Sequence, residues 1–355
     1  MSWYTQYGKD GDVVLSSRVR LARDLTGYSF PHRMTIDKKS EVRDRIVSAI
    51  LSLPSVDAEK FVSLNMDLLP EPDRIALVEK HLISDDLAKG GPGQSVCISK
   101  DESISIMINE EDHVRIQVMD CGFSLDKAYR KAEEIAVFLE KHLPVAYSEQ
   151  YGFMTACPTN TGTGMRASVM VHLPALTMLG RMQPLIDGLS HAGFAVRGYL
   201  GEHSQANGNI YQLSNQITLG ITETNVLLSF KRMVEEVLML ERKLRSELFD
   251  SNPEKIRDRV YRSFGELLYA RMMTDTEAMK RISDLRLGIA LGFFRELSEE
   301  TLSGLAAFIG PAGVQKDKGE VLSAPQQEVH RAEMIRRILT ENKSQECDSK
   351  KKKPQ

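Results

Sequence analysis

The chain has 355 residues, of which 42% are hydrophobic and 27% are charged, and its formal net charge at pH 7 is -3. This composition is that of an ordinary globular protein, and the length allows two domains of usual size. The slightly negative charge argues against direct nucleic-acid binding, which needs an overall or clustered basic excess.

The four cysteines (Cys97, Cys121, Cys157 and Cys347) show no CxxC spacing. A chain of this length does not depend on disulfide bonds, so we expect free thiols in a reducing cytoplasm. The first residues are polar and lack the apolar region of a signal peptide. No apolar run approaches the roughly 18 residues that indicate a membrane span. The sequence therefore predicts a cytoplasmic protein with no membrane partner.

Up to residue 225, strand-like segments rich in β-branched residues alternate with helix-like segments. The strands are predicted at residues 13–15, 103–108, 114–118 and 168–173, and the helices at residues 40–53, 125–142 and 178–192. The second and third strands flank the short acidic segment Asn109–His113, which is typical of an antiparallel hairpin. This order predicts an α+β domain with a largely antiparallel sheet.

After residue 225 the pattern becomes helical. Apolar residues recur at three- and four-residue spacing from Val226 to Leu248, and Asn252-Pro253 and Ser298-Glu299-Glu300 are typical helix starts. We expect a smaller all-helical domain at residues 250–341, followed by a disordered, lysine-rich tail at residues 342–355. The apolar helix faces favour self-association, so a homodimer is expected.

Five arginines of the first domain stand out: Arg18, Arg20, Arg115, Arg166 and Arg197. Each of them alone is explained as a solvated surface residue, and that alternative stays open. Together they match the bidentate, charge-assisted hydrogen bonds that a triphosphate accepts. The chain has no GxxxxGK[ST] loop and no HRD or DFG motif, so P-loop and protein-kinase types of phosphate binding are excluded.

Two glutamates supply the opposite charge. Glu111 lies in the predicted hairpin connection, and Glu202 lies in the segment 198–203. Acidic loops are usually solvated turns, but two carboxylates that face a group of arginines suit a cationic phosphoryl acceptor. A role in metal binding alone is the competing functional interpretation.

Four motifs resemble the signatures of the guanidino (phosphagen) kinase family and occur in the same order. They are SSRVR at 16–20, NEEDHVRI at 109–116, CPTNTGT at 157–163, and VRG with GEH at 196–203. The resemblance implies a guanidino-kinase catalytic domain at residues 12–245 that uses ATP.

Phosphagen kinases carry a helical domain before this catalytic domain, whereas here the first arginine motif lies at residue 18 and a helical extension follows. This arrangement is similar to that of bacterial protein arginine kinases, as are His81 and the segments 214–220 and 284–288. The resemblance implies ATP-dependent phosphorylation of arginine side chains in proteins, which gives N-phosphoarginine. We expect an acceptor site open to an arginine on a polypeptide.

The resemblance, together with the chemistry of arginine, implies roles for three residues of the acceptor site. Glu111 is expected to be the general base, and Glu202 to hold the guanidinium by bidentate hydrogen bonds. Cys157 is expected to hydrogen-bond the guanidinium as a thiolate favoured by nearby cations. A role for Cys157 as a small buried hydrophobic residue is the alternative.

The resemblance also assigns the ATP contacts. The residues are Ser16, Ser17, Arg18, Val19, Arg20, His81, Arg115, Arg166, Ala167, Ser168, Val169, Met170, Arg197, Gly198, Tyr199, Leu200, Gly201 and Glu202. His81 is expected to pack on adenine. Mg²⁺ is expected to bridge phosphate oxygens with few protein ligands, and no metal site made by the protein is predicted.

The sequence departs from the family pattern at two places. Leu200 and Gln205 stand where arginine kinases have arginine and glutamate, which predicts a different acceptor specificity. Protein arginine kinases also carry an allosteric phosphoarginine pocket with the motif Arg-Asp-x-x-Arg-Ala. The matching residues here are Gln327, Glu328, Val329, His330, Arg331 and Ala332. Glutamine replaces the first arginine, so the pocket loses one donor to phosphate.

The resemblance further implies partners. They are a zinc-binding activator protein, a heat-shock repressor and misfolded proteins as substrates, and a Clp unfoldase and protease that degrades marked proteins in stress response and quality control. Two alternatives remain, a phosphagen kinase for a small free guanidino compound and a non-catalytic phosphoarginine-binding adaptor. The complete set of arginines and acceptor-site residues argues against the adaptor.

Overall fold

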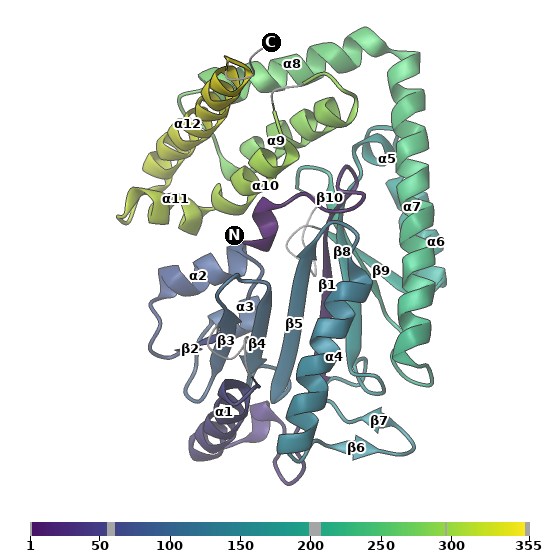
Figure 1. The fold of residues 1–355 in the computed structure, drawn as a ribbon, viewed down its shortest axis with the longest axis vertical. Coiled ribbons are helices and arrows are strands. Elements are labelled where there is room, and N and C mark those ends of the chain that lie inside the picture. Colours follow the sequence, from purple (N-terminus) through teal and green to yellow (C-terminus); the bar gives the residue numbers. More distant parts are fainter. Residues whose placement is uncertain (1, 55–60, 199–206, 295–296, 352–355) are drawn as a thin grey trace.

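The computed structural model describes residues 2–54, 61–198, 207–294 and 297–351, and only the backbone of residues 342–351. The strands of the main sheet are β1 Val14–Arg23, β2 Phe61–Asn65, β3 Ser95–Ser99, β4 Ile104–Ile108, β5 Val114–Cys121, β8 Met165–His172, β9 Phe194–Gly198 and β10 Ile210–Asn215. Within the described ranges they form an eight-stranded sheet in the order β2-β3-β4-β5-β1-β8-β10-β9 (Figure 1). Every neighbouring pair is antiparallel, which confirms the predicted α+β class.

The predicted hairpin around the acidic segment is formed by β4 and β5. Ile108 pairs with Val114, and the backbone N–H of Asn109 donates to the carbonyl of His113 at 3.1 Å. All residues of β4 are buried, because the strand lies inside the sheet and is covered on both faces. The acidic connection thus projects from the ends of two fixed strands. A separate small hairpin pairs β6 (Tyr147–Ser148) with β7 (Gly152–Phe153).

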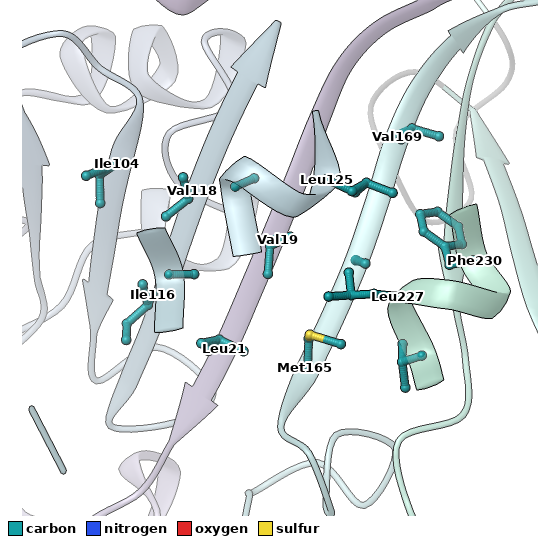
Figure 2. Close-up of a cluster of buried hydrophobic side chains, with 14 of the residues drawn as sticks. Val19, Leu21, Ile104, Ile116, Val118, Leu125, Met165, Val169, Leu227 and Phe230 are labelled. Carbon is teal, nitrogen blue, oxygen red and sulfur yellow. The ribbon is translucent and has the colours of Figure 1, made fainter. Parts of the chain in front are cut away.

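The helices of the first part are α1 Ile36–Leu51, α2 Glu71–Glu79, α3 Asp85–Ala88, α4 Leu125–His142, α5 Pro174–Met178, α6 Met182–His191 and α7 Glu223–Ser251. Helix α4 packs on β1 and β5, and α7 packs on β8 and β10. Figure 2 shows Val19 and Leu21 of β1 in the same apolar cluster as Leu125 of α4 and Phe230 of α7. Full burial of one such side chain stabilises the fold by about 1.5–3 kcal/mol. After the register shift between Val14 and Ser16, the odd-numbered residues of β1 from Ser17 to Arg23 therefore face the core side, and the even-numbered residues face the opposite side.

The helix predicted at residues 178–192 is α6, which begins only at Met182, after the short helix α5 has ended at Met178. Gly180 lies between them with φ +66°, a left-handed conformation that ends a helix and favours glycine. The apolar spacing continues across this break, which is why the sequence pattern began the helix four residues too early.

The second part contains α8 Pro253–Tyr269, α9 Asp275–Ala290, α10 Glu299–Phe308, α11 Pro311–Lys318 and α12 Ala324–Lys351. Ser298 caps α10 as predicted, through a hydrogen bond of 3.3 Å from the N–H of Thr301 to its hydroxyl. The apolar cluster of these helices includes Ile210 of β10, and Leu15 and Met170 of the sheet pack against it. The helical part therefore covers the end of the sheet directly (Figure 1).

The backbone of residues 342–351 continues helix α12 to Lys351, where the sequence predicts the start of a disordered tail, and residues 352–355 lie outside the described residues. The segment contains no glycine or proline before Pro354, and its glutamate, glutamine and lysine residues have good helix propensity. No helix in the part of the chain that the structure describes is long and apolar enough to cross a bilayer.

Candidate active site

A cavity of about 1100 Å³ lies between the non-core face of the sheet, helices α2 and α3, and the helical part. Eight of the predicted site residues line it: Arg18, Arg20, His81, Glu111, Arg115, Cys157, Arg166 and Arg197. The cavity is also lined by Glu79 on α2 and by Asp275 and Gly310 of the helical part. The sequence did not indicate that the helical extension would reach this cavity.

The strand register brings the arginines together. Arg20 of β1 pairs directly with Arg166 of β8, and Arg18 pairs with Ser168. On the other side of β1, Ala22 pairs with Arg115 of β5. Side chains at directly opposed positions have Cβ atoms about 5 Å apart, and like charges there destabilise the sheet. An anion between these side chains removes that cost.

The electrostatics of the cavity agree with this geometry. Burial and the charges of Arg115, Arg166 and Arg197 lower the pKa of Arg18 to about 10. Burial and the neighbouring arginines also lower the pKa of Arg20. The side chains of Arg18, Arg20 and Arg115 are only partly exposed. The Nε atoms of Arg20 and Arg115 are buried and have no hydrogen-bond partner. Arginine stays protonated in proteins, so the lowered pKa values of Arg18 and Arg20 reflect several positive charges close together. Such a group of charges favours a bound anion.

Polar neighbours hold the arginines in position. Arg18 donates from Nε to Ser168 Oγ at 3.1 Å and from Nη2 to Gln212 Oε1 at 2.7 Å. Arg115 pairs with Glu110 at 3.0 Å, and Arg166 Nη2 lies 3.4 Å from Asn160 Oδ1. Sequence analysis missed Gln212. A signal for it is the amide side chain between Tyr211 and Leu213 in strand β10, which is buried.

His81 lines the cavity and has φ +58°, a left-handed conformation. Its carbonyl accepts a hydrogen bond of 2.7 Å from Gln117 Nε2, which fixes the backbone at this turn. Burial and the charge of Arg18 lower the pKa of His81 to about 4. The imidazole is therefore neutral, and a neutral aromatic ring at the cavity wall suits stacking on a nucleobase.

The acidic connection presents its two glutamates differently. Glu110 is held by Arg115 and by the hydroxyl of Ser84. Glu111 lines the cavity and is exposed. Glu202, predicted as the second carboxylate, lies outside the described residues, as do Tyr199, Leu200, Gly201 and Gln205.

Cys157 is half-buried, and its thiol lines the cavity, so it is not a buried core residue. Its Sγ lies 3.0 Å from Thr159 Oγ1, and its carbonyl accepts from the Thr155 hydroxyl at 2.8 Å. Gly162 has φ +111°, and a Cβ atom there would collide with the carbonyl of Thr218. The glycine therefore allows the close packing that holds this loop.

The remaining predicted ATP residues separate by strand alternation. Val19, Ala167 and Val169 belong to the apolar core on the opposite face of the sheet, so their side chains do not reach the cavity. Ser17 is also turned away from the cavity, and its hydroxyl donates to the Gly122 carbonyl at 2.8 Å. Ser168 accepts a hydrogen bond from Arg18, and Gly198 is the last residue of β9. Ser16 and Met170 line a small neighbouring cavity of about 70 Å³. A run of consecutive strand residues cannot all face one ligand.

The segment predicted as a phosphoarginine pocket lies on α12. Arg331 is buried and donates from Nε to the Ile309 carbonyl at 2.6 Å and from Nη1 to the Met273 carbonyl at 2.9 Å. Four of the other residues contact the helical part. Gln327 donates to the Leu322 carbonyl, the Glu328 carbonyl accepts from Met273 N–H, His330 contacts Asp317, and Ala332 is buried in the apolar cluster. Val329 is exposed. Arg331 thus cross-links two helix connections to α12.

Among the described residues, no three histidine, cysteine, aspartate or glutamate side chains are placed to hold a metal ion together.

Comparisons with known proteins cover nearly the whole chain. Residues 41–244 match the C-terminal catalytic domain of ATP:guanido phosphotransferases, and residues 253–351 match the C-terminal domain of the protein-arginine kinase McsB. The chain is 42% identical over 337 residues to a protein-arginine kinase of Halothermothrix orenii, covering 95% of this chain and 96% of that protein. It is 41% identical over 337 residues to a protein-arginine kinase of Shouchella clausii, covering 95% and 94%.

Solved structures agree with the fold of the first part. A duplicated taurocyamine kinase from Schistosoma mansoni with bound transition-state analogue components has a TM-score of 0.57 at 33% identity. The similarity covers 68% of this chain and 34% of that chain. A lombricine kinase has a TM-score of 0.59 at 24% identity, covers 68% of this chain and 69% of that one, and supports the fold alone.

Proposed function

We propose a mechanism from the premise that this chain belongs to the protein-arginine kinases, a group of ATP:guanido phosphotransferases. The reaction moves the γ-phosphoryl group of ATP to an arginine side chain of a protein and gives N-phosphoarginine and ADP. The observation that supports it best is the convergence of Arg18, Arg20, Arg115, Arg166 and Arg197 on one cavity beside Glu111 and Cys157.

The arginines would bind the triphosphate, and His81 would pack on the adenine. Several planar guanidinium groups give bidentate hydrogen bonds to phosphate oxygens, which fix the γ-phosphorus in one place. The buried, unpartnered Nε atoms of Arg20 and Arg115 fit this role, because each offers a donor that the protein does not satisfy.

The acceptor guanidinium would be oriented by Glu111, Glu202 and Cys157. Glu111 takes one proton from the attacking nitrogen as the N–P bond forms and the bond from the γ-phosphorus to the bridging oxygen of ADP breaks. A guanidinium has a pKa above about 12 and is a weak nucleophile, so alignment matters most. Well-oriented reactants save roughly 7–11 kcal/mol of the barrier.

Mg²⁺ would enter with ATP and neutralise charge on the phosphate oxygens. The donors of the cavity fit a triphosphate that brings its own ion, because its basic side chains bind phosphate rather than metal. This chain's residues would hold the nucleotide, and the phosphate oxygens would hold the ion.

The wider role rests on the family. We propose that residues 12–245 are the catalytic unit and residues 250–341 a dimerisation and regulatory unit. Substrates would include a heat-shock repressor and misfolded proteins, with a zinc-binding activator and a Clp unfoldase and protease as partners in a cytoplasmic stress response. Because Arg331 donates to two carbonyls, we propose that the Gln327–Ala332 segment supports the helical part more than it binds phosphoarginine.

One experiment tests the activity. The protein is incubated with Mg-ATP and an arginine-rich unfolded protein, and arginine phosphorylation is measured by mass spectrometry under neutral conditions. The product is expected to be acid-labile, as an N–P bond is. Faster phosphorylation of free arginine than of the protein would favour a phosphagen kinase, and no transfer to either acceptor would contradict both readings.

A further inference from the structure

We propose that Asp112 is a positioning residue of the acceptor site, because its carboxyl group joins the segment that carries Glu111 to the loop that carries Cys157. The inference rests on the proposed function for its effect on turnover. The physical link between the two segments is a property of the fold and is tested separately.

The first step is the anchoring of the acidic segment at both of its ends. Asn109 is buried and has φ +54°, and its Nδ2 donates to the carbonyls of Lys39 at 2.8 Å and Gly93 at 2.7 Å. At the other end, Asp112 and His113 are fully buried. Glu111, between these anchors, is exposed at the cavity. Its position is therefore set from both ends by Asn109 and Asp112, neither of which lines the cavity, and by Glu110, whose carboxylate accepts from the Glu111 N–H at 2.9 Å.

The second step is the contact with the cysteine loop. The Asp112 Oδ1 atom accepts a hydrogen bond of 2.7 Å from the backbone N–H of Ala156, the residue before Cys157. Asp112 directly follows Glu111 in the chain. The Asp112 carboxyl group thus belongs to the residue next to Glu111, the proposed base. It also binds the residue next to Cys157, whose thiol is proposed to contact the acceptor guanidinium. The separation of these two groups depends on this hydrogen bond.

The third step is the support of Asp112 by the buried side chain of Asp24. Its carboxyl group lies beside that of Asp24, which is also buried and accepts from the N–H of His113 at 2.8 Å, and the Oδ2 atoms of both carboxyl groups are buried with no hydrogen-bond partner among the other described residues. Burial, Asp24 and the charge of Glu111 raise the pKa of Asp112, so the carboxyl group stays protonated and donates to Asp24. Two buried carboxyl groups that share a proton form a fixed pair. This pairing leaves Asp112 Oδ1 as the acceptor for the N–H of Ala156.

The test compares two substitutions at Asp112. Asp112→Ala removes the acceptor, and we expect kcat to fall by up to about 100-fold while the KM for ATP stays close to that of the wild type. Asp112→Asn keeps an oxygen for Ala156 N–H and an N–H for Asp24, so it reproduces the protonated carboxyl group and is expected to restore kcat. A defect of the same size in both variants, or none in Asp112→Ala, would overturn the proposal.

A second measurement does not need the kinase activity. The rate at which iodoacetamide labels Cys157 is followed by peptide mass spectrometry without ATP, with a thermal unfolding curve for each variant. We expect faster labelling in Asp112→Ala and the wild-type rate in Asp112→Asn. An unchanged rate in folded Asp112→Ala contradicts the link even if the wild type proves inactive toward arginine.

Two further variants keep the test decisive. Ala156→Pro removes the N–H donor but leaves the buried pair intact, so it covers the case in which Asp112→Ala does not fold, and it is expected to show the same loss of kcat and faster labelling. Asp284→Ala is the control, because it removes a buried carboxylate that binds Arg259 and Ser263 in the helical part. It is expected to lower stability without changing the labelling of Cys157. Wild-type kcat in Ala156→Pro would overturn the proposal.

Discussion

Arg20 on β1 and Arg166 on β8 occupy directly opposed positions of an antiparallel pair, and both side chains line the same cavity. Two like charges in this arrangement repel each other, and Arg18 and Arg115 increase the repulsion at Arg20. The free protein therefore holds an unfavourable charge cluster that a triphosphate relieves.

We expect Arg20→Met to weaken ATP binding by about 10-fold or more, because a hydrogen bond to a charged group contributes about 1.5–3 kcal/mol. Without ATP, the same variant is expected to unfold at a higher temperature than the wild type, because one of the repelling charges is gone. Calorimetric titration with ATP and thermal unfolding measure the two effects. The control is Arg130→Met, an exposed arginine of α4 on the other face of the sheet. A less stable Arg20→Met protein would show that no unfavourable charge cluster exists.

Glu111→Gln is expected to lower kcat by about 10²–10⁴-fold, because the substitution removes a general base without changing the shape of the side chain. ATP affinity is expected to stay close to the wild-type value, since other residues hold the phosphates. Steady-state kinetics with a protein substrate measure both quantities. Glu149→Gln, an exposed glutamate in the turn of the small hairpin, is the control. Turnover equal to that of the wild type would exclude Glu111 as the base.

Glu79 of α2 caps helix α11, because its carboxylate accepts from the N–H groups of Ala312 at 2.8 Å and Gly313 at 2.9 Å. Glu79→Ala is expected to destabilise the protein by about 1–2 kcal/mol, the usual effect of losing a helix cap. Amide hydrogen exchange in α11 is expected to accelerate, while α8 keeps its protection. Glu71→Ala, an exposed glutamate at the start of the same α2, controls for a general effect on that helix. Unchanged exchange in α11 would show that the contact does not hold the two parts together.

The contribution of Asp112 to the stability of the protein is expected to fall as pH rises toward 8. Burial, together with Asp24 and Glu111, raises the pKa of Asp112 from 3.8 to about 8. The folded state therefore keeps a proton that the unfolded state releases, so the contribution is complete below pH 3.8 and is lost progressively up to about pH 8. The amide side chain of the Asp112→Asn variant does not ionise. Its unfolding temperature relative to the wild type is expected to rise between pH 5 and pH 8, and a difference that is constant with pH would contradict the proton assignment.

Arg331→Ala is expected to unfold at a lower temperature, because it leaves the buried carbonyls of Ile309 and Met273 without a donor. Each buried group left unpaired costs about 1–3 kcal/mol. Free phosphoarginine is expected not to raise the unfolding temperature of the wild type. A clear stabilisation by phosphoarginine that disappears in Arg331→Ala would show that the segment still binds this ligand.

The amino-acid sequence by itself determined the class of the fold and the β4–β5 hairpin, and it named the candidate residues of the site. Arginines two residues apart on a strand must face one side, and the motif around Cys157 is specific enough to indicate guanidino chemistry. Those inferences depend on local spacing, which a sequence states directly. Because of that spacing, the five arginines line one cavity once the strands have paired.

Only the tertiary structure decided which arginines oppose each other, that Gln212 supports Arg18, and that Glu79 joins α2 to α11. It also showed that Val19 and Ala167 face the core although Arg18, Arg20 and Arg166 beside them line the cavity. The physical reason is that strand register and the packing of distant helices depend on contacts between residues far apart in the chain. The hydrogen bond from Ala156 to Asp112 spans 44 positions, and no local pattern encodes it.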